Sequence, residues 1–270
     1  MLSHNLILNT VKAKETIAAI ETMKPVITLI LIVLTFISCK KVQFSDSQSG
    51  GLVDAVRAPR RLVEKRVLPP PPLKFKDVVI LGNSITFTPS NPFGEWKGNW
   101  GMAASAIDSD YVHRLAVRLK TLDPTCQVTA RNIAEFEEGY VNYDFDANLK
   151  DLRDGKPDLL ILRIGEDIDV ASFNANVFKQ RYQALINYFA ANNGRLRVLA
   201  VGPVWNAYLA ESIMRSFSPY ASLAHINDDL TNTSQGLFQT PGIALHPSDK
   251  GMRMITDTIW SAIKRLQPIR

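Results

Sequence analysis

A serine early in the chain and a histidine near its end form the residue pair with the clearest chemistry. Ser84 follows the apolar run of residues 78–81 and the turn residues Gly82 and Asn83, while His246 lies in a turn just before a helical pattern. A hydroxyl and an imidazole that meet in space can act as nucleophile and general base. A Gly-Asn-Ser turn by itself is usually only a turn, so the histidine supplies much of the support for this interpretation.

The position of Ser84 favours a reactive role. Residues 78–81 are consecutive apolar residues, which predicts a strand buried in a parallel sheet. In an open α/β sheet, ligands bind in the crevice outside the carboxyl ends of the strands. We expect Ser84 to lie there with its backbone N–H available to an oxyanion, and Asn83 beside it to shape that site.

Two blocks of the chain resemble the SGNH/GDSL hydrolases. The family's first block reads Gly-Asp-Ser and stands here as residues 82–84, and its last reads Asp-x-x-His-Pro and stands here as residues 243–247. Residues 100–105 and 110–113 are similar to a bacterial lipoprotein branch of that family. The resemblance covers residues 74–266 and implies ester hydrolysis by the serine and the histidine.

The resemblance also shows where the chain departs from the family. The family's Gly-x-Asn block aligns with Gly165, Glu166 and Asp167, and its asparagine donates to the oxyanion. An ionised carboxylate accepts hydrogen bonds but cannot donate one, and losing an oxyanion donor typically costs about 100- to 1000-fold in rate. Burial beside Glu166 would allow a protonated Asp167 to donate.

The second family block has no glycine in register. Counting from Asn132, the glycine whose N–H completes the family's oxyanion hole is replaced by Glu137, and Gly139 comes two residues late. A backbone N–H survives substitution, so the donor persists if the turn does. We expect the acidic side chains of this stretch, Glu137 included, to be solvated loop charges.

The aspartate that orients the family's histidine is Ile243 here. Such a partner sets the tautomer of the imidazole and stabilises the imidazolium. Without it, His246 would rely on a backbone carbonyl, on Asp249 or Glu166, or on no partner. Asp249 is also explained as the N-cap of the closing helix, which is the interpretation we favour.

Aromatic and basic residues at the ends of predicted strands are candidates for contacting a substrate. Trp96, Trp100 and Trp205 fall in loops at the carboxyl ends, and Arg163 ends a strand. Indole rings there can stack on a sugar or cap the core beside an irregular loop. Arg163 can pair with Glu166, with Asp167 or with an acidic substrate.

Residues 1–39 are predicted to be a leader with a lipoprotein-type signal peptide. Residues 25–38 carry no charge and precede Cys39. A bilayer span needs about 20 apolar residues, so this shorter run fits a signal-peptide core. A small residue before Cys39 resembles a lipobox and predicts lipidation there, with Met23 as the start, although a plain secretory signal and an anchoring helix are alternatives. We expect a lipoprotein anchored in the bacterial cell envelope, either periplasmic or at the cell surface.

Residues 40–73 are interpreted as a polar, basic and proline-rich linker, and residues 74–270 as the hydrolase-like domain. Residues 40–66 carry seven basic and three acidic side chains, whereas residues 67–270 carry 21 of each sign. Such a neutral domain lacks the charge excess of a nucleic-acid-binding protein. The histidines and Cys126 have no metal-ligand spacing, so we expect no metal and no cofactor.

Strand and helix patterns alternate through this domain. Long connections between strands predict a parallel sheet with helices on both faces, which is a three-layer α/β/α sandwich with about five strands. The predicted strands are residues 78–82, 127–131, 159–163 and 197–201, and the predicted helices are residues 110–122, 173–191 and 250–266.

Two functions are compatible with these observations. The first is an envelope-anchored serine esterase that hydrolyses acyl esters, such as O-acetyl groups on a polysaccharide, through a Ser-His pair. The second is a lipoprotein that binds a carbohydrate or other ligand on a degenerate hydrolase scaffold, which the departures at Glu137, Asp167 and Ile243 favour. We favour the esterase because lost supporting donors lower a rate rather than abolish it.

Overall fold

The computed structural model describes residues 73–205, 208–217 and 219–266. The predicted signal peptide with Met23 and Cys39, and nearly all of the linker, lie outside the described residues and stay predictions. Within the described part of the chain, no helix is long and apolar enough to cross a membrane.

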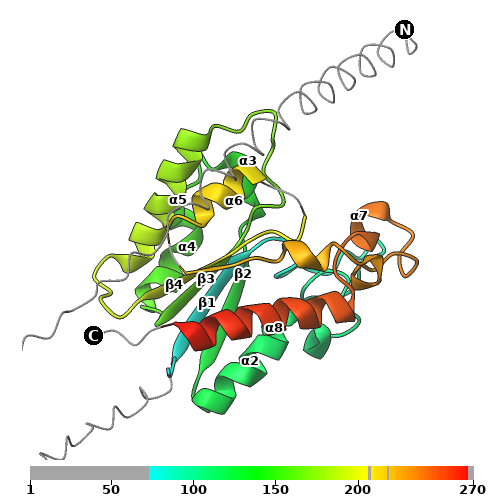
Figure 1. The fold of residues 1–270 in the computed structure, drawn as a ribbon, viewed down its shortest axis with the longest axis horizontal. Helices are drawn as coiled ribbons and strands as arrows, with labels where there is room; N and C mark the ends of the chain where they lie inside the picture. The colour runs from blue at the N-terminus through cyan, green and yellow to red at the C-terminus, as the bar shows by residue number, and fades with distance from the viewer. Residues whose placement is uncertain (1–72, 206–207, 218, 267–270) are drawn as a thin grey trace, which may run out of the picture. The chain divides into compact units, whose positions relative to one another are not determined.

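Five parallel strands form one sheet in the order β2-β1-β3-β4-β5 (Figure 1). The strands are β1 (Asp77–Gly82), β2 (Gln127–Asn132), β3 (Leu159–Arg163), β4 (Arg197–Val201) and β5 (Tyr220–Ala221). All of β3 is buried, and so is all of β1 after its first residue. These central strands are continuous apolar runs because helices cover both of their faces.

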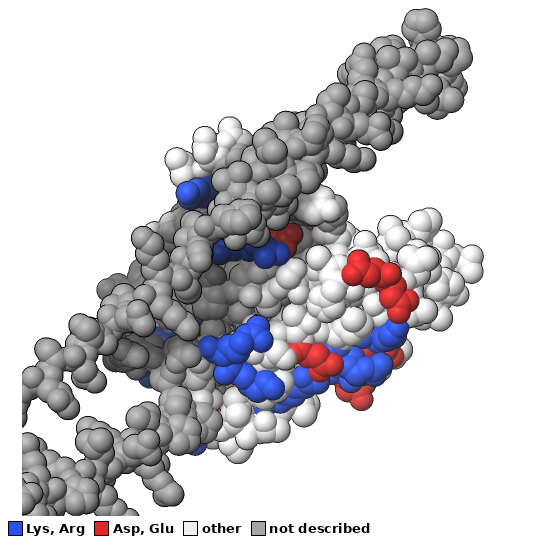
Figure 2. Space-filling model, in the orientation of Figure 1, with Lys and Arg blue, Asp and Glu red and all other residues white. Residues whose placement is uncertain are grey.

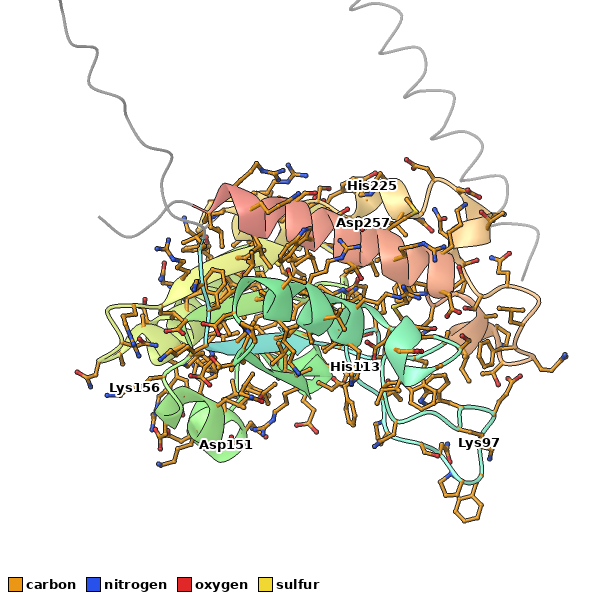
Figure 3. The ribbon with its side chains drawn as sticks, turned by 90° about the horizontal axis from the view of Figure 1, so that it is seen from below. Lys97, His113, Asp151, Lys156, His225 and Asp257 are labelled. Carbon is orange, nitrogen blue, oxygen red and sulfur yellow. The ribbon has the colours of Figure 1, made fainter. Side chains whose placement is uncertain are left out.

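Helices form the two outer layers. Their bounds are α2 (Tyr111–Leu122), α8 (Asp249–Arg265), α4 (Phe145–Asp154), α5 (Ala175–Ala190) and α6 (Tyr208–Met214). α2 and α8 lie side by side on one face, and α4, α5 and α6 lie on the other (Figures 1 and 3). Alternate strand residues serve the two faces, with Ile80 in the core under α2 and α8 and Leu81 in the opposite core. The predicted three-layer α/β/α fold is confirmed.

The register of the sheet brings the ends of four strands together. Gly82 pairs with Asn132 of β2 and with Arg163 of β3, and Arg163 pairs with Val201 of β4. The loops that follow these strands therefore leave the sheet at one edge. Ser84 begins one of those loops.

The predicted strands and long helices agree with the structure to within two residues at each end. Four short helices were not predicted individually: α3 (Ala134–Gly139), α4, α6 and α7 (Pro241–Ala244). Segments this short show too few turns for a helical period to be recognised in the sequence. Two of them, α3 and α7, carry residues of the candidate site.

The closing helix α8 begins differently from the prediction. Ser248 is its N-cap, and the Ser248 hydroxyl oxygen accepts the N–H of Gly251 (3.4 Å). The N-cap interpretation of Asp249 is therefore wrong, because Asp249 is the first helical residue. Its carboxylate instead accepts the N–H (2.8 Å) and the hydroxyl (2.5 Å) of Ser105, which ties α8 to the loop before α2.

Charged side chains of both signs share the visible surface. On the face drawn in Figure 2, Lys and Arg side chains mix with Asp and Glu, and the surface over α7 carries few charges. Arg118 of α2 pairs with Asp257 of α8, which is labelled in Figure 3. This pairing keeps opposite charges together across the two helices.

Candidate active site

Ser84 stands in a tight turn directly after β1. The carbonyl oxygen of Asn83 accepts the N–H groups of Thr86 (2.9 Å) and Phe87 (3.1 Å), which closes the turn. Gly82 is required before it, because a Cβ there would stand 1.9 Å from the Thr86 hydroxyl oxygen and 2.8 Å from a backbone oxygen of β3. The turn leaves Ser84 half-buried at the carboxyl edge of the sheet.

Ser84 and His246 meet although 162 residues separate them in the chain. Ser84 Oγ lies 2.7 Å from His246 Nε2, and His246 Nδ1 lies 2.7 Å from the carbonyl oxygen of Gly242. A carbonyl oxygen only accepts, so Nδ1 carries the ring proton and Nε2 is the acceptor. The Ser84 hydroxyl therefore donates to Nε2, which is the arrangement in which an imidazole can remove the proton of an attacking serine.

The Gly242 carbonyl is available to the imidazole because α7 is only four residues long. In a continuing α-helix, the carbonyl of Gly242 would accept the backbone N–H of His246. That N–H instead bonds to the carbonyl of Ile243 (2.9 Å). The Gly242 carbonyl oxygen therefore accepts the Nδ1–H of the His246 ring in place of the His246 backbone N–H.

The two carboxylates proposed as histidine partners are engaged elsewhere. The Asp249 carboxylate bonds to Ser105, and the Glu166 carboxylate pairs with Arg163. Both predictions are wrong, because each of these side chains has a nearer donor. Of the sources of orientation that the sequence left open, the structure has the backbone carbonyl.

The surroundings of His246 keep its ring neutral. Burial lowers the pKa of His246 to about 4, the bond to Gly242 offsets this only in part, and the positive charge of Arg163 lowers the pKa further. The side chain is 8% exposed, and the Trp205 ring stands edge-on to it at 5.3 Å between centroids. The imidazole is therefore free to accept a proton at neutral pH.

A buried polar network supports the turn that holds Ser84. The Asn83 Oδ1 accepts from Arg163 Nη1 (2.6 Å), and its Nδ2 donates to Glu137 Oε1 (3.2 Å) and Glu166 Oε2 (2.8 Å). Arg163 and Glu166 also form an ion pair in which neither side chain has exposed surface. An amide both accepts and donates, whereas an ionised aspartate only accepts, which explains an asparagine at a position where the SGNH/GDSL family has aspartate.

Glu137 belongs to this network, and the expectation that its side chain is solvated is wrong. α3 turns it inward, where its Oε2 accepts the N–H groups of Gly165 (2.7 Å) and Asp167 (2.9 Å). Burial, followed by the negative charge of Glu166, raises the pKa of Glu137 to about 8. Gly139 is exposed at the end of α3, and no hydrogen bond among the described residues links it to the turn of Ser84.

Few groups near Ser84 can donate to an oxyanion. The N–H of Ser84 has no acceptor among the described residues and is free to donate. Asp167 is half-buried in the loop after β3, and burial, followed by the charges of Glu166 and Glu138, raises its pKa. A protonated Asp167 can donate a hydrogen bond, whereas its ionised form can only accept.

The predicted substrate contacts separate into three groups. Arg163 is fully buried beneath Asn83, so its prediction as a substrate contact is wrong. Trp96 is 5% exposed and its Nε1 donates to a backbone carbonyl, so it packs the loop rather than offering a face to a sugar. Trp100 is half-buried edge-on to Trp96. Trp205 is half-buried beside the imidazole and stays a candidate.

The described residues contain no group of three or more His, Cys, Asp or Glu side chains that could hold a metal ion. The carboxylate of Glu137 binds two backbone N–H groups, and that of Glu166 pairs with Arg163. Sequence reasoning missed the bridging role of Asn83. The one signal for it was an arginine closing an apolar strand, since a buried guanidinium needs polar partners.

No family model and no curated protein sequence matches the chain. Among solved structures, a putative GDSL-like lipase from Parabacteroides merdae is similar with 14% identity and a TM-score of 0.51, over 72% of this chain and 99% of that chain. A two-domain esterase active on acetylated mannans is similar over 71% of this chain, with 18% identity and a TM-score of 0.46. The match covers only half (50%) of the length of that esterase. A variant of an acetyl-xylooligosaccharide esterase from Geobacillus matches with 14% identity and a TM-score of 0.46, over 72% of this chain and 96% of that chain. The likeness to the Parabacteroides structure concerns the α/β fold alone.

Proposed function

We propose that the protein is a serine esterase with Ser84 as the nucleophile and His246 as the general base. The observation that carries the proposal is the 2.7 Å contact between Ser84 Oγ and a histidine nitrogen whose tautomer is set by Gly242. The serine is only half-buried and follows a rigid strand at the edge where α/β folds bind ligands.

The proposed reaction has two steps. Ser84 Oγ attacks the ester carbonyl carbon while its proton passes to His246 Nε2, and the Ser84 N–H donates to the oxyanion. The imidazolium then gives this proton to the leaving alcohol, and the acyl group stays on Ser84. Water attacks the acyl-serine with His246 again as the base, which releases the acid and restores the hydroxyl.

We propose carbohydrate O-acetyl esters as substrates and the bacterial cell envelope as the location. Trp205 supports the first point, since a half-buried indole beside the base can pack against a sugar ring. The uncharged run of residues 25–38 before Cys39 supports the second, with a lipid on that cysteine as the membrane anchor.

A second candidate function is ligand binding without catalysis. The observation that favours it is Asp167, which stands where the resembled family has an amide donor and whose ionised form would repel an oxyanion. Glu137 also uses its carboxylate to bind the N–H groups of the loop at Gly165 and Asp167. Retention of both Ser84 and His246 in bonding contact weighs against this function.

The experiment that separates the two functions is covalent labelling with a fluorophosphonate probe. We expect the full-length protein in detergent to be labelled, and the variants Ser84→Ala and His246→Ala to remain unlabelled, because only an activated serine reacts. Circular dichroism and thermal unfolding of each variant control for folding. A folded wild-type protein that stays unlabelled from pH 5 to 9 would establish ligand binding as the better description.

The pH dependence of the rate should report the buried histidine. Because the pKa of His246 is lowered to about 4, its base form persists far below pH 6.5, and kcat/KM on a small acyl ester should fall only as pH drops through about 4. The neutral imidazole is the active form, so the contribution of His246 to the rate rises as pH rises through about 4 and is constant above that range. A folded-state pKa below the unfolded value also means that stability decreases as pH falls from 6.5 toward 4.

This profile should be measured by diluting enzyme from pH 7 into short assays, with tryptophan fluorescence as the control for unfolding. An acidic limb centred at pH 6.5 or above would show that the base is not the buried His246.

A further inference from the structure

A loop of residues 88–102 begins and ends on the nucleophile turn. The Ser84 carbonyl oxygen accepts the hydroxyl of Thr88 and the N–H of Met102, both at 3.0 Å. Thr88 and Trp100 form an antiparallel bridge that closes the loop at its base. The part of the loop that carries Lys97 extends from the carboxyl edge of the fold (Figure 3).

This loop also packs against the segment that holds His246. Trp96 is buried in a small cluster with Ala103 and Ile243, the second of which belongs to α7. The ring of Phe238, which precedes α7, lies 6.3 Å from that of Trp96 between centroids. Ile243 therefore anchors α7 on the loop at the position where the SGNH/GDSL family has the aspartate that contacts the histidine.

Glu95 adds a polar clamp beside these apolar contacts. Its Oε1 accepts the N–H of Gln239 and its Oε2 accepts the N–H of Thr240, both at 2.7 Å. These two bonds lower the pKa of Glu95, which keeps it ionised. Thr240 is the N-cap of α7 but gives the helix no side-chain hydrogen bond. The carboxylate of Glu95 adds two hydrogen bonds that hold the chain as it enters α7.

We propose that Glu95 is a positioning residue for the Ser84–His246 pair and acts through the carbonyl of Gly242. Gly242 follows the clamped Thr240 by two residues, and its carbonyl is the group that receives the Nδ1 proton of His246. A carboxylate thus orients the histidine here too, but through one turn of backbone instead of by direct contact. The expected effect of Glu95 on the rate rests on the proposed esterase function. The expected effect of Glu95 on the orientation of the His246 ring does not.

The tautomer of His246 is the first readout, because a residue that only stabilises the fold would not change it. Long-range nitrogen–proton NMR correlations of the imidazoles distinguish the two tautomers, and the chain has four histidines, so a His246→Ala spectrum assigns the signal. We expect the wild-type protein to carry the proton on Nδ1. In Glu95→Ala the signal should shift toward a mixture of both tautomers.

The second readout is the split between kcat and KM. Misplacing a catalytic group by about 1 Å can cost on the order of 100-fold in rate, and loosening a clamp is a milder change. We expect Glu95→Ala to lower kcat by about 10-fold while KM stays within about twofold. Glu95→Gln keeps one acceptor oxygen for two N–H groups, so its kcat should fall between those of the other two proteins.

The matched control is Asp123→Ala. Asp123 is another half-buried residue whose carboxylate accepts a nearby backbone N–H, that of Thr125 (2.9 Å), but it stands before β2 at the opposite edge of the sheet. We expect that variant to keep the wild-type kcat and the wild-type tautomer. An unchanged tautomer and kcat in Glu95→Ala, or an equal loss in Asp123→Ala, would overturn the inference.

The two proposals fail in different ways. Loss of labelling in Ser84→Ala together with wild-type behaviour of Glu95→Ala would leave the esterase standing and remove only the positioning role. A wild-type protein without any labelling would remove the esterase, and the NMR spectrum of Glu95→Ala would still decide whether Glu95 orients His246.

Discussion

The variant Asp167→Asn is expected to hydrolyse esters on the order of 100-fold faster than the wild-type protein at pH 7 or above. The substitution replaces a carboxylate, which can only accept when ionised, by an amide that donates at every pH. The amide also removes a negative charge that would oppose the developing oxyanion. The relevant measurement is kcat/KM on a small acyl ester from pH 5 to 9, together with the rate of fluorophosphonate labelling.

The gain should depend on pH in a defined direction. Burial and the neighbouring carboxylates raise the pKa of Asp167, so part of the wild-type protein holds a protonated, donating Asp167 in acid. As pH rises, that fraction disappears from the wild-type protein but not from the variant. The advantage of Asp167→Asn should therefore grow with pH and then level off.

Asp169→Asn is the matched control, since it removes the same charge from the same loop. Asp169 is exposed, and its carboxylate binds the N–H of Ala171 and the hydroxyl of Ser172. We expect this variant to keep the wild-type rate. A comparable gain in Asp169→Asn would mean that net charge matters rather than a donor at position 167, and no gain in either would place Asp167 outside the oxyanion site.

The variant Arg163→Met is expected to lose about 3–5 kcal/mol of unfolding free energy. Arg163 and Glu166 form an ion pair with no exposed side-chain surface, and Arg163 also donates to Asn83. Methionine fills a similar volume but leaves the Glu166 carboxylate buried without its cation. Denaturant unfolding at pH 7, monitored by tryptophan fluorescence, measures the loss.

Two comparisons locate the cause of that loss. The double variant Arg163→Met/Glu166→Gln should recover part of the stability, because it removes the uncompensated charge together with its partner. Lys150→Met removes one member of an exposed ion pair with Asp154 and should change the unfolding free energy by less than about 1 kcal/mol. A loss in Arg163→Met no larger than that of Lys150→Met would contradict the importance of the buried pair.

The network also connects stability to the reactive turn. Arg163, Glu166 and Glu137 all bond to the amide of Asn83, whose backbone precedes Ser84. The buried Arg163–Glu166 ion pair is thus bonded to the residue that precedes the serine. A buried ion pair is a weak source of net stability, but the hydrogen bonds to Asn83 constrain the backbone that leads into Ser84.

Much of the fold was predictable because its signals are local. Short continuous stretches of sequence carry the patterns for the main elements. Apolar runs predict β1, β3 and β4, and apolar residues at helical spacing predict α2, α5 and α8. β5, with two residues, and α7, with four, are too short for a pattern to show. Their positions depend on tertiary packing against the other elements of the fold.

The sequence by itself determined the residue types at the site: a serine after a buried strand, a histidine before the last helix, and Asp167 and Ile243 at family positions that usually hold other residues. Only the tertiary structure decided what these residues do to one another. Any residue has a carbonyl, so nothing in the sequence could single out that of Gly242 as the partner of His246. Burial likewise lowers the pKa of the imidazole to about 4, and burial is a property of contacts between segments far apart in the chain.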